Sequence, residues 1–208
     1  MSIVVAVQKN GQMAIASDSQ SVYGRSHRED ERNLASKDKI QIVGSAYLGY
    51  TGWGLYSNIF RHYMHGRKTP PRLIDEHSIF SFFLKFLKDL RVKYALLNDQ
   101  ANTDKDPFAD LDSSFLVASR NGIYGISSNL SVCQFKQYHA IGSGCDYAFG
   151  ALYALYDSSL GAEAIARAAV EAAIRFDTDC GGEIAMYTFK AARSRQSAAA
   201  PAKTPRAK

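Results

Sequence analysis

Ser2 follows the initiator methionine, and a serine in this position can do chemistry. Because serine is small, we expect Met1 to be removed, so that the mature chain begins with a hydroxyl and a free α-amine on one residue. An α-amine has a pKa of about 8, so part of it is neutral at neutral pH and can take the proton of the hydroxyl. This is the amine-activated form of nucleophilic catalysis. Serine is common at this position, so the prediction depends on the residues around it.

The residues after Ser2 predict a β-hairpin that places a carboxylate beside it. Residues 3–8 and 13–17 are β-prone, and Asn-Gly at 10–11 is a strong hairpin turn signal. With this turn, paired residues have numbers that sum to about 21. Ser2 therefore falls opposite Ser19 and next to Asp18. A carboxylate there can pair with a nearby cation, or it can simply end the strand in a turn.

Groups of strands alternate with pairs of helices along the rest of the chain. Residues 22–37 are polar and predict a long connection, and residues 101–112 predict a loop. Periodicity and turn signals predict further strands at 40–43, 47–51, 114–118, 123–127, 132–135, 138–141 and 184–189. The same signals predict helices at 55–65, 76–98, 146–156 and 162–176.

Two of the helices have apolar stripes that need a sheet to cover them. In the helix at 76–98, the stripe consists of Phe80, Phe83, Leu87, Leu90, Tyr94 and Leu97. In the helix at 162–176, it consists of Ile165, Ala169, Ala172 and Phe176. Two antiparallel sheets face to face, each covered by a helix pair, would bury every apolar face. The sequence therefore predicts an α+β, four-layer αββα sandwich.

Length and charge indicate one folded domain and a separate tail. The 208 residues fit a single domain at 1–190, followed by a basic, low-complexity segment at 191–208 that we expect to be disordered. The net charge is +5, but residues 190–208 carry six positive charges and no negative one, which leaves −1 for the rest. The positive charge thus belongs to the tail rather than to a face of the fold. This argues against a nucleic-acid-binding module and for no nucleic-acid partner.

The sequence also argues against a membrane, secreted or metal-binding protein. No run reaches the roughly 18 apolar residues of a transmembrane helix, and the apolar run after Ser2 is too short for a signal peptide. Cys133, Cys145 and Cys180 are too few and too scattered for a disulfide framework or a zinc site. We therefore expect a cytoplasmic protein with reduced thiols, no cofactor, no metal and no membrane partner.

Five segments, in chain order, resemble one known family. The first hairpin is similar to that of proteasome β-subunits and of HslV, the bacterial proteasome-like peptidase. The others resemble the family's lysine strand, its Ala-Gly-Gly turn, its Gly-Ser-Gly helix start and its Asp-x-x-Ser-Gly-Gly segment. They are Lys-Ile-Gln-Ile-Val at 39–43, Tyr-Thr-Gly-Trp-Gly at 50–54, Gly-Ser-Gly-Cys-Asp-Tyr-Ala at 142–148 and Asp-Thr-Asp-Cys-Gly-Gly at 177–182. With the long phenylalanine-rich helix, the resemblance is closest to the beta-proteobacterial proteasome homologue.

This resemblance implies the N-terminal nucleophile hydrolase fold and a catalytic centre. It identifies Ser2 as the nucleophile of a threonine/serine-type endopeptidase, with Asp18 and Lys39 as an ion pair beside it. The lysine ammonium would lower the pKa of the terminal amine and help to move the hydroxyl proton. Lys37 is an alternative, because a gapless alignment backwards from Gly52 places Asp38 at the lysine position.

The resemblance also implies roles around the nucleophile. The backbone N–H of Gly52 would donate to the oxyanion, Ser143 would hold the terminal amine, and Asp177 would support the same network. The substrate would be bound by three further residues. Tyr50 would form the floor of the pocket for the residue before the cleaved bond, while Val22 and Gly54 would offer backbone to an extended peptide.

The chain departs from the family pattern at two positions. The family nucleophile is usually threonine, whereas Ser2 lacks the methyl group that restricts the rotamer. The serine before the Gly-Gly pair is Cys180 here, and a thiol is a weaker hydrogen-bonding group.

Family membership further implies an assembly, and it leaves other functions open. We expect a homo-oligomeric double ring, with a tetradecamer favoured over a dodecamer, which acts on unfolded polypeptides and can be served by an AAA+ unfoldase. The basic tail could touch such a partner or simply be solvated. The alternatives are a catalytically silent ring subunit, which would keep Met1, and an amidohydrolase with the same nucleophile that acts on small amides.

Overall fold

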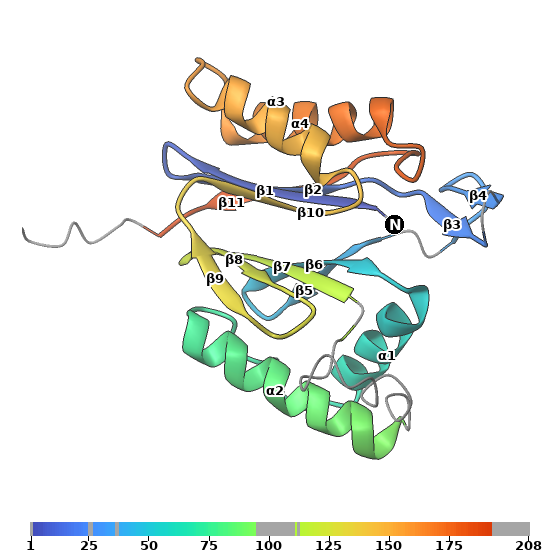
Figure 1. Cartoon of the computed structure of the whole chain (residues 1–208). Coiled ribbons are helices and arrows are strands. Elements are labelled where there is room, and N and C mark those ends of the chain that lie inside the picture. The colour runs from blue at the N-terminus through green and yellow to red at the C-terminus, as the bar shows by residue number, and fades with distance from the viewer. Residues whose placement is uncertain (1, 25–26, 36–37, 95–110, 112, 193–208) are drawn as a thin grey trace, which may run out of the picture.

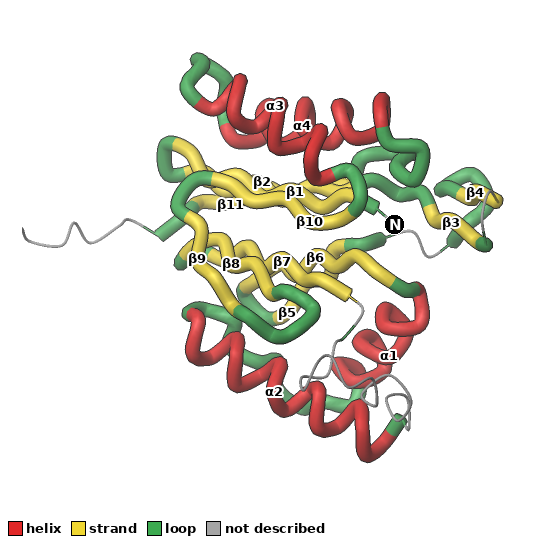
Figure 2. The backbone as a smooth tube through the Cα atoms, in the orientation of Figure 1, coloured by secondary structure: helices red, strands yellow, loops and turns green. Residues whose placement is uncertain are grey.

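Two antiparallel sheets stack face to face at the centre of the molecule, and each carries a pair of helices on its outer face (Figure 1). The computed structural model describes residues 2–24, 27–35, 38–94, 111 and 113–192. Within them, the predicted α+β, αββα architecture is confirmed (Figure 2). Most of the predicted loop at 101–112 and the tail from residue 193 onward lie outside the described residues.

The first sheet contains the predicted N-terminal hairpin at its centre. Its strand order is β10-β1-β2-β11. The strands are β1 (Ile3–Lys9), β2 (Gln12–Ser17), β10 (Tyr138–Gly142) and β11 (Ala185–Lys190). Val4 pairs with Ser17, so paired residues do sum to 21 as predicted. Asn10 and Gly11 both have positive φ, 51° and 72°, which is the turn conformation that matches the twist of the two strands.

The second sheet has the strand order β5-β6-β7-β8-β9, and it is also antiparallel. Its strands are β5 (Ile40–Val43), β6 (Ala46–Gly52), β7 (Ser113–Ser119), β8 (Gly122–Ile126) and β9 (Val132–Phe135). Every strand predicted from the sequence begins and ends within one residue of its prediction. In Figure 1, helices α1 and α2 cover this sheet and helices α3 and α4 cover the other.

The first part of the predicted long connection at 22–37 contains two short strands that the sequence analysis missed. β3 (Ser21–Tyr23) and β4 (His27–Glu29) form a small antiparallel ribbon beside the start of β1 (Figure 1). These strands are only three residues long and none of their residues is buried, so they are too short to show the alternation of apolar and polar residues that reveals a strand in a sequence.

The helices begin where the sequence predicts them, but their buried faces differ from the predicted stripes. They are α1 (Gly54–His65), α2 (Glu76–Lys93), α3 (Cys145–Tyr156) and α4 (Ala162–Phe176). In α2, Asp75 and Ser78 form a capping box that fixes the first turn. The C-cap of α2 is Tyr94, and residues 95–98 of the predicted helix lie outside the described part of the chain.

Two aromatic residues of the predicted stripes point to solvent. Phe80 is 44 % exposed and Phe176 is 64 % exposed. The buried face of α2 is instead centred on Ile79, Phe82, Phe83, Phe86, Leu87 and Leu90. That of α4 is centred on Ala162, Ile165, Ala166, Ala169, Val170 and Ala173. A buried helix face wider than one row of side chains includes positions that a single i, i+3, i+4 series omits.

A glycine lies at the contact between the two sheets. The inner faces bury Val4, Ala6, Met13 and Ile15 from the first sheet against Leu116, Ala118 and Ile123 from the second. Gly49 of β6 faces Val4, and a Cβ atom at position 49 would collide with Cγ1 of that valine. Val4 itself is fully buried and cannot move aside into solvent.

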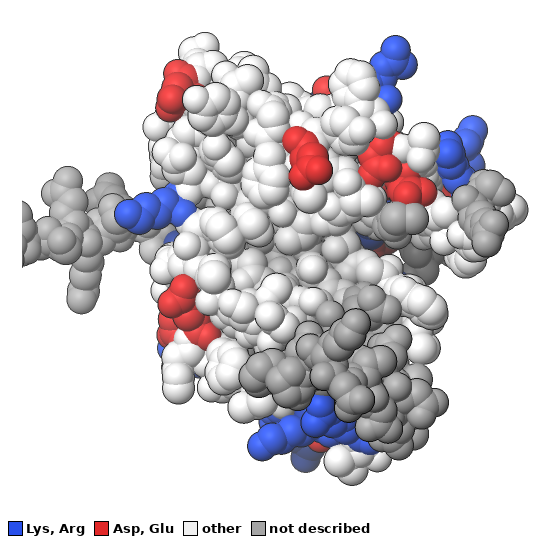
Figure 3. Space-filling view, viewed as in Figure 1, with Lys and Arg blue, Asp and Glu red and all other residues white. Residues whose placement is uncertain are grey.

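On the face shown in Figure 3, charged side chains of both signs are spread over the surface, and Lys and Arg side chains gather at its lower edge, over α2. Within the described residues, no helix combines the length and the apolar character that a membrane crossing requires.

Gly49→Ala tests the contact between the sheets. We expect a loss of about 1–3 kcal/mol in the free energy of unfolding, because the added methyl group overpacks a filled core. Gly150→Ala in α3 is the matched control, since a Cβ atom there meets nothing within 4 Å and alanine favours the helix. Urea unfolding at a fixed protein concentration measures both. Equal effects of the two changes would contradict this account of the interface.

Candidate active site

Ser2 is held by its backbone at one end of the sandwich, immediately before β1. The residue is only 6 % exposed, yet it lines a cavity of about 630 Å³. Its nitrogen, which is joined to Met1 in this chain, donates to Ser143 Oγ at 3.3 Å. Its carbonyl oxygen accepts from the Gly144 N–H at 3.5 Å. The residue predicted to be the nucleophile is therefore fixed at the edge of a cavity.

A glycine on the neighbouring strand makes this position possible. Gly142 has a φ of +109°, in the region that favours glycine, and it pairs with Ile3 in the ladder between β10 and β1. A Cβ atom on residue 142 would collide with the carbonyl oxygen of Ser2. The first glycine of the Gly-Ser-Gly segment thus lets the backbone of β10 approach Ser2, and it brings Ser143 to the Ser2 nitrogen.

Below Ser2, Asp18 forms a buried ion pair with Lys39. Asp18 has no exposed surface, and its Oδ1 lies 2.6 Å from Lys39 Nζ. The same oxygen accepts from the Ile3 N–H at 3.0 Å, and Oδ2 accepts from the Gly181 N–H at 3.1 Å. Three donors from three segments therefore converge on one carboxylate. The strand-end turn that was the alternative for Asp18 does not account for these contacts.

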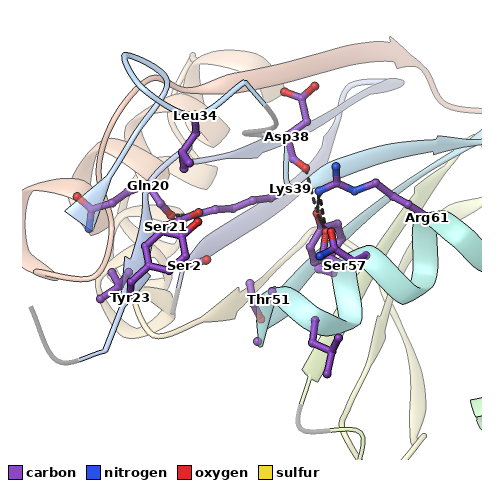
Figure 4. Close-up of a pocket in the computed structure, with 16 residues that line it drawn as sticks. Ser2, Gln20, Ser21, Tyr23, Leu34, Asp38, Lys39, Thr51, Ser57 and Arg61 are labelled. Carbon is purple, nitrogen blue, oxygen red and sulfur yellow. Dashed lines mark hydrogen bonds between the residues drawn. The ribbon is translucent and has the colours of Figure 1, made fainter. Parts of the chain in front are cut away.

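Lys39 lies just before β5 on the opposite sheet, and its side chain extends towards Ser2 (Figure 4). Besides Asp18, its Nζ donates to the Gln20 carbonyl oxygen at 2.6 Å. Burial lowers the pKa of the Lys39 ammonium below its usual value, and the Asp18 carboxylate offsets only part of that effect. Lys39, rather than Asp38, is the residue that makes this pair, and Lys37 lies outside the described residues.

A second carboxylate supports Ser143 from the other side. Burial alone would raise the pKa of Asp177, but hydrogen bonds from Ser143, the Asp179 N–H and Cys180 outweigh it and hold that pKa below its usual range. The Asp179 N–H lies 2.9 Å from Oδ1, and Cys180 Sγ donates to Oδ2 at 3.3 Å. Burial raises the pKa of the Cys180 thiol above its usual range, so this thiol stays protonated and acts as a donor.

The predicted substrate-binding residues line the cavity beside Ser2. Val22, Tyr50 and Gly54 all contribute to it, together with Gly52 and Lys39. A second cavity of about 770 Å³ continues from Val22, Gly52 and Gly54 and reaches Ser143. Gly52 has a φ of +130°, a backbone conformation that favours glycine.

The structure thus gathers all nine predicted site residues at one end of the sandwich. Sequence reasoning missed the groups that complete the network. The Gln20 carbonyl, the Gly181 N–H and Glu31 belong to this set; Glu31 accepts from Ser19 Oγ and from the Glu183 N–H. Two of these are backbone groups. Their hydrogen-bond partners depend on contacts between distant segments, which cannot be predicted from residue type.

The arrangement supports nucleophilic and acid–base chemistry. A hydroxyl and its own backbone nitrogen face a cavity, a buried ammonium lies beside them, and hydroxyl and carboxylate groups hold the nitrogen. Among the residues that the structure describes, no group of three His, Cys, Asp or Glu side chains could hold a metal ion. Proton transfer within this network needs only the groups named here.

The fold is shared with solved structures of known proteins. The chain is similar to BPH from Thiobacillus denitrificans in complex with epoxomicin, with a TM-score of 0.84 and 30 % identity over 91 % of this chain and 99 % of that one. A second Thiobacillus denitrificans BPH structure gives a TM-score of 0.82 at 30 % identity, over 92 % and 99 % of the two chains. Eukaryotic HslV from Trypanosoma brucei shares the fold, with a TM-score of 0.60 and 20 % identity over 90 % and 99 %. No protein-family model and no curated protein matches the sequence.

Single and double changes of Asp18 and Lys39 test whether their contact is a coupled pair. Asp18→Asn leaves a buried ammonium without its carboxylate, and Lys39→Met leaves the carboxylate without its ammonium. We expect each change to lower the free energy of unfolding by about 3–5 kcal/mol. Because the double variant contains neither charge, it should lose clearly less than the two single losses combined. Urea unfolding of all four proteins measures the coupling.

The matched control is the surface pair of Arg32 and Asp30, whose Nη2 and Oδ2 atoms also lie 2.6 Å apart. Arg32→Gln should change stability little, because solvent screens exposed pairs. Strict additivity at Asp18 and Lys39 would show that the two residues act independently.

Proposed function

This chain belongs to the family of proteasome β-subunits and HslV-like peptidases, and we propose on that basis that it is a peptidase subunit whose nucleophile is Ser2. The observation that carries the proposal is the position of Ser2, which lies at a cavity beside a buried lysine with its nitrogen bound to Ser143. Removal of Met1 would turn that nitrogen into an amine without moving the hydroxyl. The proposed activity is endopeptidase cleavage of polypeptides.

In the first half of the proposed reaction, the terminal amine accepts the proton of Ser2 Oγ as that oxygen attacks the carbonyl carbon of the substrate. The C–O bond forms, and the carbonyl electrons move to oxygen to give a tetrahedral oxyanion. In this proposal, the N–H of Gly52, a residue that lines the cavity, donates to the oxyanion. The oxyanion then collapses, the C–N bond breaks, and the leaving amine takes the proton from the Ser2 ammonium. An ester of Ser2 remains.

In the second half, the neutral amine of Ser2 takes a proton from water, and the resulting hydroxide oxygen attacks the ester carbon. Collapse of the second tetrahedral species breaks the bond to Oγ. The proton on the amine returns to Oγ, and the product leaves as a carboxylic acid. Water is the only co-reactant, so the cycle balances with the groups of the site.

The surrounding charges have separate roles in this proposal. The Lys39 ammonium disfavours a second positive charge on the amine and stabilises negative charge on Oγ. Asp18 keeps the ammonium charged and in place. Ser143 orients the amine, and Asp177 orients Ser143. Lys39 is therefore the electrostatic partner of the reacting groups, and the two carboxylates position other groups.

The substrate would bind as an extended strand along the two cavities. Val22 on β3 and Gly54 at the start of α1 line both of them, and in this proposal their backbone groups pair with the peptide backbone. Tyr50 forms part of the wall of the first cavity, where the side chain before the cleaved bond would enter.

The proposal extends to the assembly by family membership. We propose a cytoplasmic homo-oligomeric double ring, a tetradecamer or a dodecamer, that encloses these sites and receives unfolded polypeptides, with an AAA+ unfoldase as a candidate partner. Such a ring restricts access to chains that are already unfolded. Light scattering of the purified protein distinguishes the ring from a small-amide hydrolase that works as a monomer or dimer.

Ser2→Ala tests the nucleophile directly. Intact mass should show that the wild-type chain lacks Met1, and epoxomicin should add covalently to it. An epoxyketone has two electrophilic carbons, which match a hydroxyl and a free amine on one residue. We expect Ser2→Ala to lose adduct formation and to lower peptidase kcat by at least about a thousandfold. Ser2→Thr, which keeps the hydroxyl and adds a methyl group that restricts the rotamer, should retain activity.

A wild-type chain that retains Met1 and forms no adduct would favour the silent ring subunit instead. Adduct formation by Ser2→Ala at the wild-type rate would place the nucleophile elsewhere.

The pH dependence of kcat/KM tests the roles of the amine and of Lys39. The amine must be neutral to accept a proton, so activity should rise with pH through its pKa, which has a reference value of about 8. The ammonium of Lys39 must be charged. Because burial lowers its pKa, activity should fall again at a pH below its ordinary 10.5. A stopped assay from pH 5 to 11, on protein shown to stay assembled, should give a bell-shaped plot of kcat/KM against pH. If kcat/KM does not fall on the alkaline side before pH 10.5, the proposed role of Lys39 is contradicted.

A further inference from the structure

A carboxylate outside the cavities joins the small ribbon of β3 and β4 to the loop that follows α4. Glu31 lies two residues after β4, and its Oε2 accepts hydrogen bonds from Ser19 Oγ at 2.5 Å and from the Glu183 N–H at 2.9 Å. Glu31 itself lines neither of the two cavities beside Ser2. One side chain thus connects the segment after β2, the turn after β4 and the loop after α4.

The contact around this carboxylate is closely packed. Gly182 has a φ of +75°, and a Cβ atom on it would collide with Ser19 Oγ and with the Glu31 carboxylate. Ser19 is buried, and its N–H donates to the Gly181 carbonyl oxygen at 3.1 Å. The hydrogen bonds from Ser19 and from the Glu183 N–H hold the pKa of Glu31 below its usual value, so the carboxylate is charged at neutral pH. Glu31 therefore accepts both hydrogen bonds as a charged group, which strengthens them.

The segment that Glu31 anchors supplies residues of the first cavity. The turn after β4 is closed by a hydrogen bond from the Leu34 N–H to the Asp30 carbonyl oxygen at 2.8 Å, and Leu34 lines the cavity (Figure 4). β4 also pairs with β3, whose Val22 lines both cavities. No residue of either strand is buried, so the hydrophobic core does little to hold the ribbon. Its position therefore depends on anchors such as Glu31.

We propose that Glu31 is a positioning residue for substrate binding, which holds the ribbon and its turn, and with them Val22 and Leu34, where an extended peptide at Ser2 can meet them. The inference rests on the proposed function, since it concerns the substrate of that same site. Because Glu31 lines neither cavity, it meets no reacting atom. Its effect is the same for the bound substrate and for the transition state, so its loss raises KM more than it lowers kcat.

Steady-state kinetics of the assembled full-length protein test the proposal, with the fluorogenic tetrapeptide that the wild type cleaves best. Glu31→Ala should raise KM about tenfold and change kcat less than about threefold. Acylation of Ser2 by a small β-lactone, which has no peptide backbone for the ribbon to bind, should keep its rate within about threefold of wild type. Glu31→Gln should recover most of the wild-type KM, because the amide oxygen still accepts from Ser19 and from the Glu183 N–H.

Two further positions show whether the effect comes from this contact. Ser19→Ala removes one of the two hydrogen bonds from the other side and should raise KM about threefold, and combining it with Glu31→Ala should raise KM no further than Glu31→Ala alone. Glu29→Ala is the matched control. Glu29 also makes two side-chain hydrogen bonds, but its partners His27 and Asn33 belong to its own strand and turn, so this variant should keep the wild-type KM. Light scattering confirms that each variant assembles, and Ser19→Ala decides the question if Glu31→Ala does not.

The outcomes are distinct for the proposed function and for this inference. An unchanged KM in Glu31→Ala, or a fall in kcat and in lactone acylation as large as the fall in kcat/KM, overturns the inference and leaves the peptidase function standing. If the wild type cleaves no peptide, the peptidase proposal fails. Binding of a labelled tetrapeptide to Ser2→Ala, with and without Glu31→Ala, then tests the inference by itself. Binding that Glu31→Ala weakens about tenfold supports it, and equal binding rejects it.

Discussion

One buried carboxylate connects the parts of the molecule that form the site. Asp18 accepts hydrogen bonds from Lys39, which precedes the first strand of one sheet, and from the N–H of Ile3 in the other sheet. It also accepts from the Gly181 N–H, in the loop after α4. An isolated buried charge would be costly, and the three donors and the paired ammonium offset that cost. Because all of them come from different segments, Asp18 can be satisfied only when the whole fold is in place.

The parts that the sequence predicted well depend on short-range rules. The turn at Asn10 and Gly11 sets the register of the first hairpin, and that register alone puts Asp18 near Ser2. Strand and helix bounds followed in the same way from periodicity and from turn residues. Lys39 needed more than pattern: resemblance to a family selected it over Lys37, and the contact with Asp18 then appeared in the structure.

The parts that escaped prediction depend on contacts between distant segments. The need for glycine at position 142 comes from the carbonyl of Ser2, 140 residues earlier in the chain, which approaches it from the neighbouring strand. The Gln20 carbonyl became a ligand of Lys39 only because β5 ends up beside the segment after β2. Phe80 satisfied a helical stripe but faces solvent, because the sheet covers the neighbouring side of α2. None of these three features can be predicted from a local sequence pattern.

Lys39 and Asp18 show why the cavity and the core of the molecule depend on each other. Lys39 is buried against a full negative charge, and its Nζ also donates to the Gln20 carbonyl oxygen. Burial lowers the pKa of this ammonium, and the Asp18 carboxylate offsets part of that effect. The pair therefore keeps a charged donor at the cavity that Ser2 lines, in a place where an ammonium without a carboxylate would lose its proton more easily.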